Sequence, residues 1–183
     1  MNITQEPKYD LVQRGDKIRW QNRSSGRTIP DYEPVFVLRG GDAMAATVLL
    51  KYASILSDTH RGAPLLQAHQ NAVLNRMHDF NAFWISHPHL MKIHPVPAYE
   101  TRLDETGHTA LFNDDAKVPE YEPLFLFRAR DKHACEAIAF YIKVAPMQAQ
   151  IDCAQRALEE FQEFRRIHGV LMKTPDTDNN PNI

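Results

Sequence analysis

Residues 30–42 read PDYEPVFVLRGGD, and residues 119–131 read PEYEPLFLFRARD. Both stretches follow the pattern Pro-x-Tyr-Glu-Pro-x-Phe-x-x-Arg-x-x-Asp. The match resumes further along the chain, where FNAFWISHPHLMK (residues 80–92) parallels FQEFRRIHGVLMK (residues 161–173). Two matches in the same order indicate that one unit occurs twice. The sequence therefore predicts a tandem duplication, and the function of the protein involves two copies of one small module.

The composition is that of an ordinary globular protein. The 183 residues carry a net charge of −2, with 43% apolar and 24% charged residues. No apolar run reaches the ~20 residues of a membrane span, and the N-terminus lacks the basic-then-apolar pattern of a secretion signal. We therefore expect a cytoplasmic protein. We expect no binding to genomic nucleic acid, since such binders usually show a strong basic excess.

Each copy shows the same order of local patterns. It begins with a short apolar run, residues 35–38 in the first copy, which is too short for a helix and indicates an extended segment. Apolar residues then recur at helical spacing in two stretches, over 43–58 and 66–87 in the first copy and over 132–145 and 147–164 in the second. We predict a mainly α fold of two tandem helical-hairpin modules, each a short extended lead-in followed by two long antiparallel helices.

Composition also suggests how the remaining segments are organised. In order along the chain, we predict a polar N-terminal arm (1–29), helical-hairpin repeat 1 (30–95), a linker (96–118), helical-hairpin repeat 2 (119–175) and a flexible tail (176–183). A short hairpin is expected around Gly107 in the linker. Modules of this size bury little surface alone, so the copies should pack together or the chain should form a homo-oligomer.

The repeated arginines are candidates for binding an anion. Arg39 and Arg128 each stand three residues before an aspartate, Asp42 or Asp131, that is expected to cap the following helix. The free amides and the dipole of a helix N-terminus favour an anion, and a guanidinium there could bind phosphate in a bidentate manner. Alternatively, each arginine pairs with the repeated Glu or Asp and only fixes the turn.

The repeated tyrosines and the cations of the second copy extend this candidate site. Tyr32 and Tyr121 could stack on a nucleobase, or each ring could hold the lead-in segment on the hairpin. Arg130 and Lys132 flank the capping aspartate only in the second copy. The candidate ligand-binding residues are therefore Tyr32, Arg39, Tyr121, Arg128, Arg130 and Lys132, with Asp42 and Asp131 as structural caps.

Motifs for metal binding and catalysis are absent from the sequence. His87, His89 and His94 lack accompanying cysteines and match no zinc spacing. Cys135 and Cys153 lie in helix-patterned segments and are expected to be buried, reduced thiols. The chain shows no nucleophile elbow, no repeated carboxylate pair and no glycine-rich phosphate loop. We therefore expect no metal, no cofactor and no enzymatic activity.

The second copy resembles a known family. The stretch EPLFLFRARDKHACEAIAFY (residues 122–141), the long second helix and the closing LMKTP (residues 171–175) resemble the helical-hairpin domain of phage anti-CBASS and anti-Thoeris sponges. The resemblance covers residues 30–95 and 119–175. It implies an oligomeric phage protein in the cytoplasm of an infected bacterial host. Such a protein binds and sequesters cyclic nucleotide second messengers, either cyclic oligonucleotides or cyclic ADP-ribose derivatives, without cleaving them.

The sequence also departs from this family. Known sponges of this type usually carry one hairpin per chain, and the first copy here lacks a lysine after its aspartate. One competing interpretation is a structural or protein-interaction module of an oligomeric assembly with no small-molecule ligand. Another is a nuclease or phosphodiesterase that acts on the same messengers. Charge reversal of Arg128 is expected to abolish ligand binding in a sponge and to reduce stability or assembly in a structural module.

Overall fold

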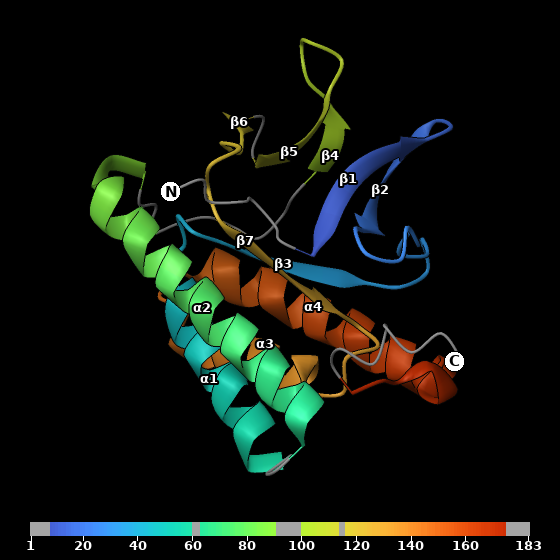
Figure 1. Cartoon of the computed structure of the whole chain (residues 1–183), viewed down its shortest axis with the longest axis vertical. Coiled ribbons are helices and arrows are strands. Elements are labelled where there is room, and N and C mark those ends of the chain that lie inside the picture. Colours follow the sequence, from blue (N-terminus) through green and yellow to red (C-terminus); the bar gives the residue numbers. More distant parts are fainter. Residues whose placement is uncertain (1–7, 60–62, 91–99, 114–115, 175–183) are drawn as a thin grey trace.

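The structure is a computed structural model that describes residues 8–59, 63–90, 100–113 and 116–174. These residues form four α-helices, two short 3-10 helices and seven β-strands. The strands make three small sheets, ordered β1-β2, β3-β7 and β4-β5-β6. Figure 1 shows the helices on one side of the β3-β7 sheet and the other two sheets on the opposite side. The tail 176–183 lies outside the described residues.

The two lead-in segments are strands that pair with each other. β3 (Val35–Arg39) and β7 (Leu124–Arg128) form an antiparallel two-stranded ribbon. Val37 lies opposite Leu126 at its centre, and these two residues occupy equivalent positions in the repeat. Exchanging the copies therefore maps the register onto itself. The same crossed pattern continues beyond the strands, from the Gly40 amide to the Pro123 carbonyl oxygen and from the Ala129 amide to the Pro34 carbonyl oxygen. The two copies form an internal pseudo-dimer.

The helices cover one face of this ribbon. In the first copy α1 (Ala45–Thr59) packs against α2 (Pro64–Ser86), and in the second α3 (Ala134–Val144) packs against α4 (Gln148–Ile167). α1 also packs against α3, which joins the two pairs. These helices lie within a few residues of the stretches with helical spacing. Their buried side chains and one face of the ribbon form the larger hydrophobic core.

The mainly α fold that we predicted is nevertheless wrong, because the described chain is 49% helix and 23% strand. Two small sheets come from segments outside the repeats. β1 (Tyr9–Arg14) and β2 (Lys17–Asn22) form a hairpin in the expected polar arm. β4 (Glu100–Leu103), β5 (Thr109–Asn113) and β6 (Ala116–Lys117) form a sheet in the expected linker, with the β4-β5 hairpin around Gly107.

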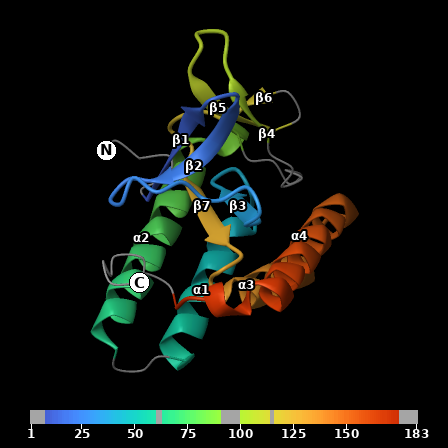
Figure 2. The ribbon, with the colours of Figure 1, turned by 90° about the vertical axis from the view of Figure 1, so that its right-hand side faces the viewer.

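These additional strands bury the second face of the ribbon. Val37 and Leu126 point away from the helices into a second core, where they meet Tyr9, Trp20 and Leu111 from the small sheets. Figure 2 shows the ribbon between the small sheets and the helices. The runs VFVL and LFLF are apolar at every position, so both faces of the ribbon must be covered. Helices alone would have left one apolar face in water.

Candidate ligand-binding site

The repeated arginines form ion pairs that cross between the copies. Arg39 donates to both carboxylate oxygens of Glu122, at 2.5 and 2.6 Å. Arg128 donates to both carboxylate oxygens of Glu33, at 2.8 and 2.7 Å. Both glutamate side chains are fully buried. Each arginine thus pairs with the repeated Glu, as one alternative held, but with the Glu of the other copy.

The environment of Arg128 keeps its guanidinium charged. Burial is the largest single effect and disfavours the charged form, but the hydrogen bonds and charge interactions with Glu33 and Tyr9 together outweigh it and raise the pKa of Arg128 above its ordinary value. Nη1 of Arg128 also donates to the hydroxyl of Tyr9, at 3.3 Å. Arg128 is therefore held by residues from two other segments, and its guanidinium is a fixed positive charge.

The two aspartates also link the copies. Each accepts a hydrogen bond at 2.8 Å from the backbone amide two residues further on, at the start of its helix. The second carboxylate oxygen accepts from a tyrosine of the other copy, from Tyr141 to Asp42 at 2.7 Å and from Tyr52 to Asp131 at 2.5 Å. Burial raises the pKa of both carboxyl groups above the ordinary value, although these hydrogen bonds oppose the shift. The aspartates thus accept from the turn that leads into each helix and also pair the copies, whereas the N-cap position of α3 is His133.

Tyr32 and Tyr121 lie against the closing segment of the other copy. The Tyr32 ring is 5.1 Å from the ring of His168, and the Tyr121 ring is stacked on His87 at 5.0 Å. The two tyrosines remain 57% and 49% exposed. They therefore hold the lead-in segments on the helices, while an outer part of each ring stays open to solvent.

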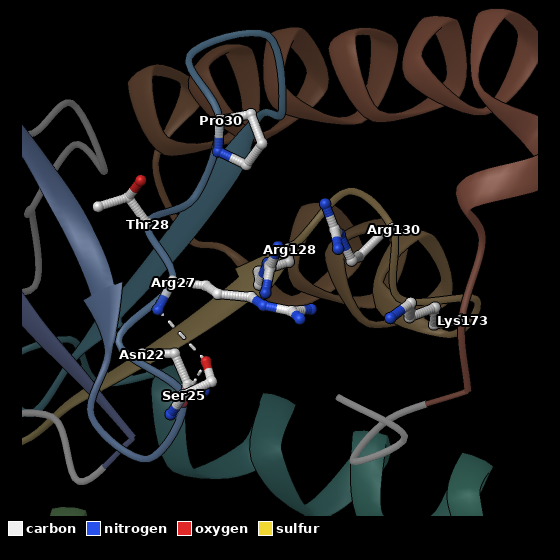
Figure 3. A pocket seen from close by; sticks show the side chains of 8 residues that line it. All are labelled: Asn22, Ser25, Arg27, Thr28, Pro30, Arg128, Arg130 and Lys173. Carbon is white, nitrogen blue, oxygen red and sulfur yellow. Dashed lines mark hydrogen bonds between the residues drawn. The ribbon is translucent and has the colours of Figure 1, made fainter. Parts of the chain in front are cut away.

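A basic pocket lies beside the crossed ion pair of the second copy (Figure 3). Its volume is about 180 Å³. Figure 3 shows the Arg27 side chain reaching toward Arg128 from one side, with Lys173 on the opposite side. The pocket is lined by Asn22, Ser25, Arg27, Thr28, Pro30, Arg128, Arg130 and Lys173.

The pocket has an excess of positive charge. Arg27, Arg128, Arg130 and Lys173 contribute four cations, and the neighbouring carboxylate is that of the buried Glu33. Glu33 is already shared, since Arg130 donates to it through Nε at 2.8 Å and forms an ion pair with it through Nη2 at 2.6 Å. The Arg27 side chain makes no hydrogen bond or ion pair with any other described residue. Such a cluster of like charges favours an anionic ligand.

The backbone explains how the distant lysine reaches this pocket. After α4 and the 3-10 helix η2 (Gly169–Leu171), the chain returns to the turn that follows β7. The Lys173 amide donates to the Arg130 carbonyl oxygen at 2.8 Å, and the Lys132 amide donates to the Lys173 carbonyl oxygen at 3.1 Å. The repeated LMK segment thus places the Lys173 side chain beside Arg130.

Asn22 adds a buried donor to the wall of the pocket. Its Oδ1 accepts hydrogen bonds from the amides of Ser24 and Ser25, at 3.1 and 2.9 Å. These two donors fix which end of the side-chain amide is oxygen. The Nδ2 group is buried and has no hydrogen-bond partner among the described residues. An unpaired buried donor costs about 1–3 kcal/mol, so a ligand acceptor that reached Nδ2 would be stabilising.

The equivalent position of the first copy is chemically different. Arg130 corresponds to Gly41, and Arg27 corresponds to Ala116 when both are counted from the repeat. The Gly41 amide donates to Glu122 at 2.7 Å, and a Cβ atom built on Gly41 would lie 3.0 Å from the Glu122 carboxylate oxygen. The first copy therefore uses a backbone amide where the second uses a guanidinium. Two cations of the pocket have no equivalent there.

The structure brings together only some of the predicted ligand-binding residues. Arg128 and Arg130 line the pocket, whereas Tyr32, Arg39, Tyr121 and Lys132 do not. A ligand-binding role stays a prediction for all six residues. Sequence reasoning missed Asn22, Arg27 and Lys173. A signal existed for Lys173, which belongs to the repeated LMK triplet, but Arg27 and Asn22 precede the repeat and carry no motif.

Two other findings concern metal ions and membranes. Among the described residues, no group of three or more His, Cys, Asp or Glu side chains is arranged to hold a metal ion. His94 lies outside these residues. Both cysteines are free and partly buried. No helix in the described ranges is long and apolar enough to cross a membrane.

Comparisons with protein-family models, with curated proteins and with solved structures found no match to this chain. The resemblance to phage sponges stays a prediction from the sequence.

Proposed function

We propose that this protein binds cyclic nucleotide second messengers and sequesters them without cleaving them. The observation that supports this function is the basic pocket between the lead-in of the first copy and the turn of the second. Four cationic side chains surround it, and one buried carboxylate partly balances them. Arginine and lysine at such density are suited to phosphate groups.

The ligand class follows from charge and from the resemblance to phage sponges. Cyclic oligonucleotides and cyclic ADP-ribose derivatives all carry phosphates, which the pocket would hold. A pocket of about 180 Å³ is smaller than the roughly 300 Å³ at which sites for drug-sized ligands begin. The rest of a nucleotide would therefore extend over the surrounding surface. In this proposal the protein acts as a homo-oligomer in the cytoplasm of an infected bacterial host.

Calorimetry with the full chain tests this function. A panel of cyclic dinucleotides, cyclic trinucleotides and cyclic ADP-ribose isomers is titrated into the protein, and saturable binding of at least one messenger is expected. The complex is then denatured, and mass spectrometry should recover that messenger intact. No binding across the panel would contradict the proposed function, whereas a cleaved product would indicate a nuclease or phosphodiesterase.

The crossed ion pairs favour a second candidate function. Arg39 is 6% exposed and paired with Glu122, and Arg128 is paired with Glu33, so both have structural roles. The duplicated module could accordingly be a structural or protein-interaction unit with no small-molecule ligand. Charge reversal of Arg128 would destabilise the protein under both hypotheses. Arg27 discriminates better, because replacing it should affect ligand binding and leave the fold unchanged.

A further inference from the structure

We infer that the basic pocket is a docking site for a single phosphate group, that each chain has one such site, and that a nucleobase does not enter it. This inference deepens the proposed function and rests on it for the identity of the ligand as a nucleotide. The chemistry of the pocket is independent of that identity. The preference of the pocket for a phosphate group follows from the type and the number of the polar side chains that line it.

Two of the lining side chains, Arg27 and Asn22, offer hydrogen-bond donors that have no partner among the described residues. Arg27 has no side-chain partner among the described residues, and its guanidinium can only donate. Asn22 also lines the pocket, and its Nδ2 donor is buried and unpaired, while its oxygen accepts from two backbone amides. A ligand group that satisfies donors alone must consist of acceptors. A phosphate fits this requirement, whereas a nucleobase edge usually carries donors as well.

The charge of the pocket leads to the same ligand group. Among the described residues, four cations line the pocket against the one carboxylate of Glu33, and a phosphate would compensate one or two of the positive charges. Arg128 is held by Glu33 and Tyr9 and acts as a positioning residue. Arg27, Arg130 and Lys173 are placed to contact the phosphate from different sides (Figure 3).

One site per chain follows from the asymmetry of the copies. At the positions that correspond to the pocket, the first copy has Gly41 in place of Arg130 and Ala116 in place of Arg27. An arginine cannot replace Gly41 without displacing neighbours, since its Cβ would meet Glu122 at 3.0 Å and the Leu90 carbonyl oxygen at 3.1 Å. Glu122 and the Leu90 carbonyl oxygen therefore leave little room at Gly41 for an arginine side chain like that of Arg130.

The test uses the full chain with inorganic phosphate, adenosine 5′-monophosphate and acetate, followed by phosphorus NMR and calorimetry. We expect phosphate and the monophosphate to bind once per chain and acetate to bind much more weakly. Arg27→Ala and Asn22→Asp should each weaken phosphate binding about tenfold or more, as expected for losing a charged hydrogen bond. Asn22→Asp keeps the oxygen that orders the loop but replaces the donor by a negative charge. Arg166→Ala is the control, because it removes one positive charge from an exposed ion pair with Glu163.

The results test the phosphate site and the proposed cyclic-nucleotide function separately. Equal weakening by Arg166→Ala and Arg27→Ala would overturn the inference, because general charge would then explain the binding. Undiminished binding of a cyclic nucleotide by folded Arg27→Ala and Asn22→Asp proteins would overturn the site and leave the proposed function standing. Site-dependent binding of phosphate without binding of any cyclic nucleotide would leave the site standing and contradict the function.

Discussion

At the scale of single residues, the repeated motif joins the two copies more than it forms two ligand sites. Four largely buried side chains of each copy bind partners in the other copy. They are Arg39, Glu33, Asp42 and Tyr52 in the first copy and their equivalents Arg128, Glu122, Asp131 and Tyr141 in the second. Each of these polar groups has a partner in the other copy. This arrangement explains why the motif recurs almost unchanged, since a change on one side would leave a buried group unpaired on the other.

The crossed ion pairs should therefore be important for stability. Glu122→Gln leaves the buried Arg39 without its counter-ion, and we expect a loss of about 3–5 kcal/mol in the free energy of unfolding. Denaturant unfolding followed by circular dichroism measures it. The control is Glu120→Gln, which removes an ion pair between Lys117 and a largely exposed glutamate, and a solvent-exposed pair of this kind should contribute far less to stability. Similar losses for the two variants would contradict the structural role of Glu122.

The buried aspartates predict a pH dependence of stability. Burial raises the pKa of Asp42 and Asp131 in the folded protein above 3.8, so the folded state holds these protons more tightly than the unfolded chain. Their contribution to stability is complete below the unfolded pKa and is lost as the pH rises through the folded pKa. Asparagine can still accept from the helix amide and can donate to the tyrosine oxygen. It does not titrate.

We therefore compare the wild type with the Asp42→Asn/Asp131→Asn variant between about pH 4 and about pH 7, because the raised pKa values lie above the ordinary value. The free energy of unfolding of the variant should fall less steeply with rising pH than that of the wild type. The other titrating groups are common to both proteins and cancel in the difference. Parallel curves would show that the two carboxyl groups do not titrate differently on folding.

At the scale of secondary-structure elements, the local patterns were predictable and their partners were not. Helical spacing located the four helices, and the apolar runs indicated the extended segments. The pairing of β3 with β7 joins residues far apart in the sequence, which no local pattern reveals. The polar composition of 1–29 and 96–118 also hid strands that bury only a few side chains, such as Trp20 and Leu111.

One clue to these strands was present in the sequence. A strand that is apolar at every position must be buried on both faces, so VFVL and LFLF required a second covering layer. The candidate site was less predictable, because it combines a loop before the first copy with the end of the second. Arg128 and Arg130 could be selected from the motif, but Asn22 and Arg27 join them only through the fold.

The small sheets should accordingly contribute to the core. Trp20 is 8% exposed and packs on the ribbon, so Trp20→Ala should lower the free energy of unfolding by about 3–5 kcal/mol. Thermal or denaturant unfolding measures this loss. Leu103→Ala in β4 is the matched control, because Leu103 is 43% exposed and its truncation should cost less than about 1 kcal/mol. A small effect of Trp20→Ala would mean that the N-terminal hairpin is a loosely attached arm.

At the scale of the whole molecule, the described residues form an internal pseudo-dimer with an asymmetric basic pocket. Fusion of the copies lets each half change separately, which two identical subunits cannot do. The first copy keeps glycine at position 41, where its amide binds Glu122, and the second carries Arg130. Both copies therefore contribute equivalent contacts to the pairing, whereas only the second copy contributes the extra positive charge of Arg130 to the pocket.

Native mass spectrometry of the full chain, purified from cells that make cyclic nucleotide messengers, tests the central claim most directly. We predict one intact messenger per chain and its loss from the Arg27→Ala/Asn22→Asp variant. Two messengers per chain, no messenger, or full retention by that variant would contradict the account.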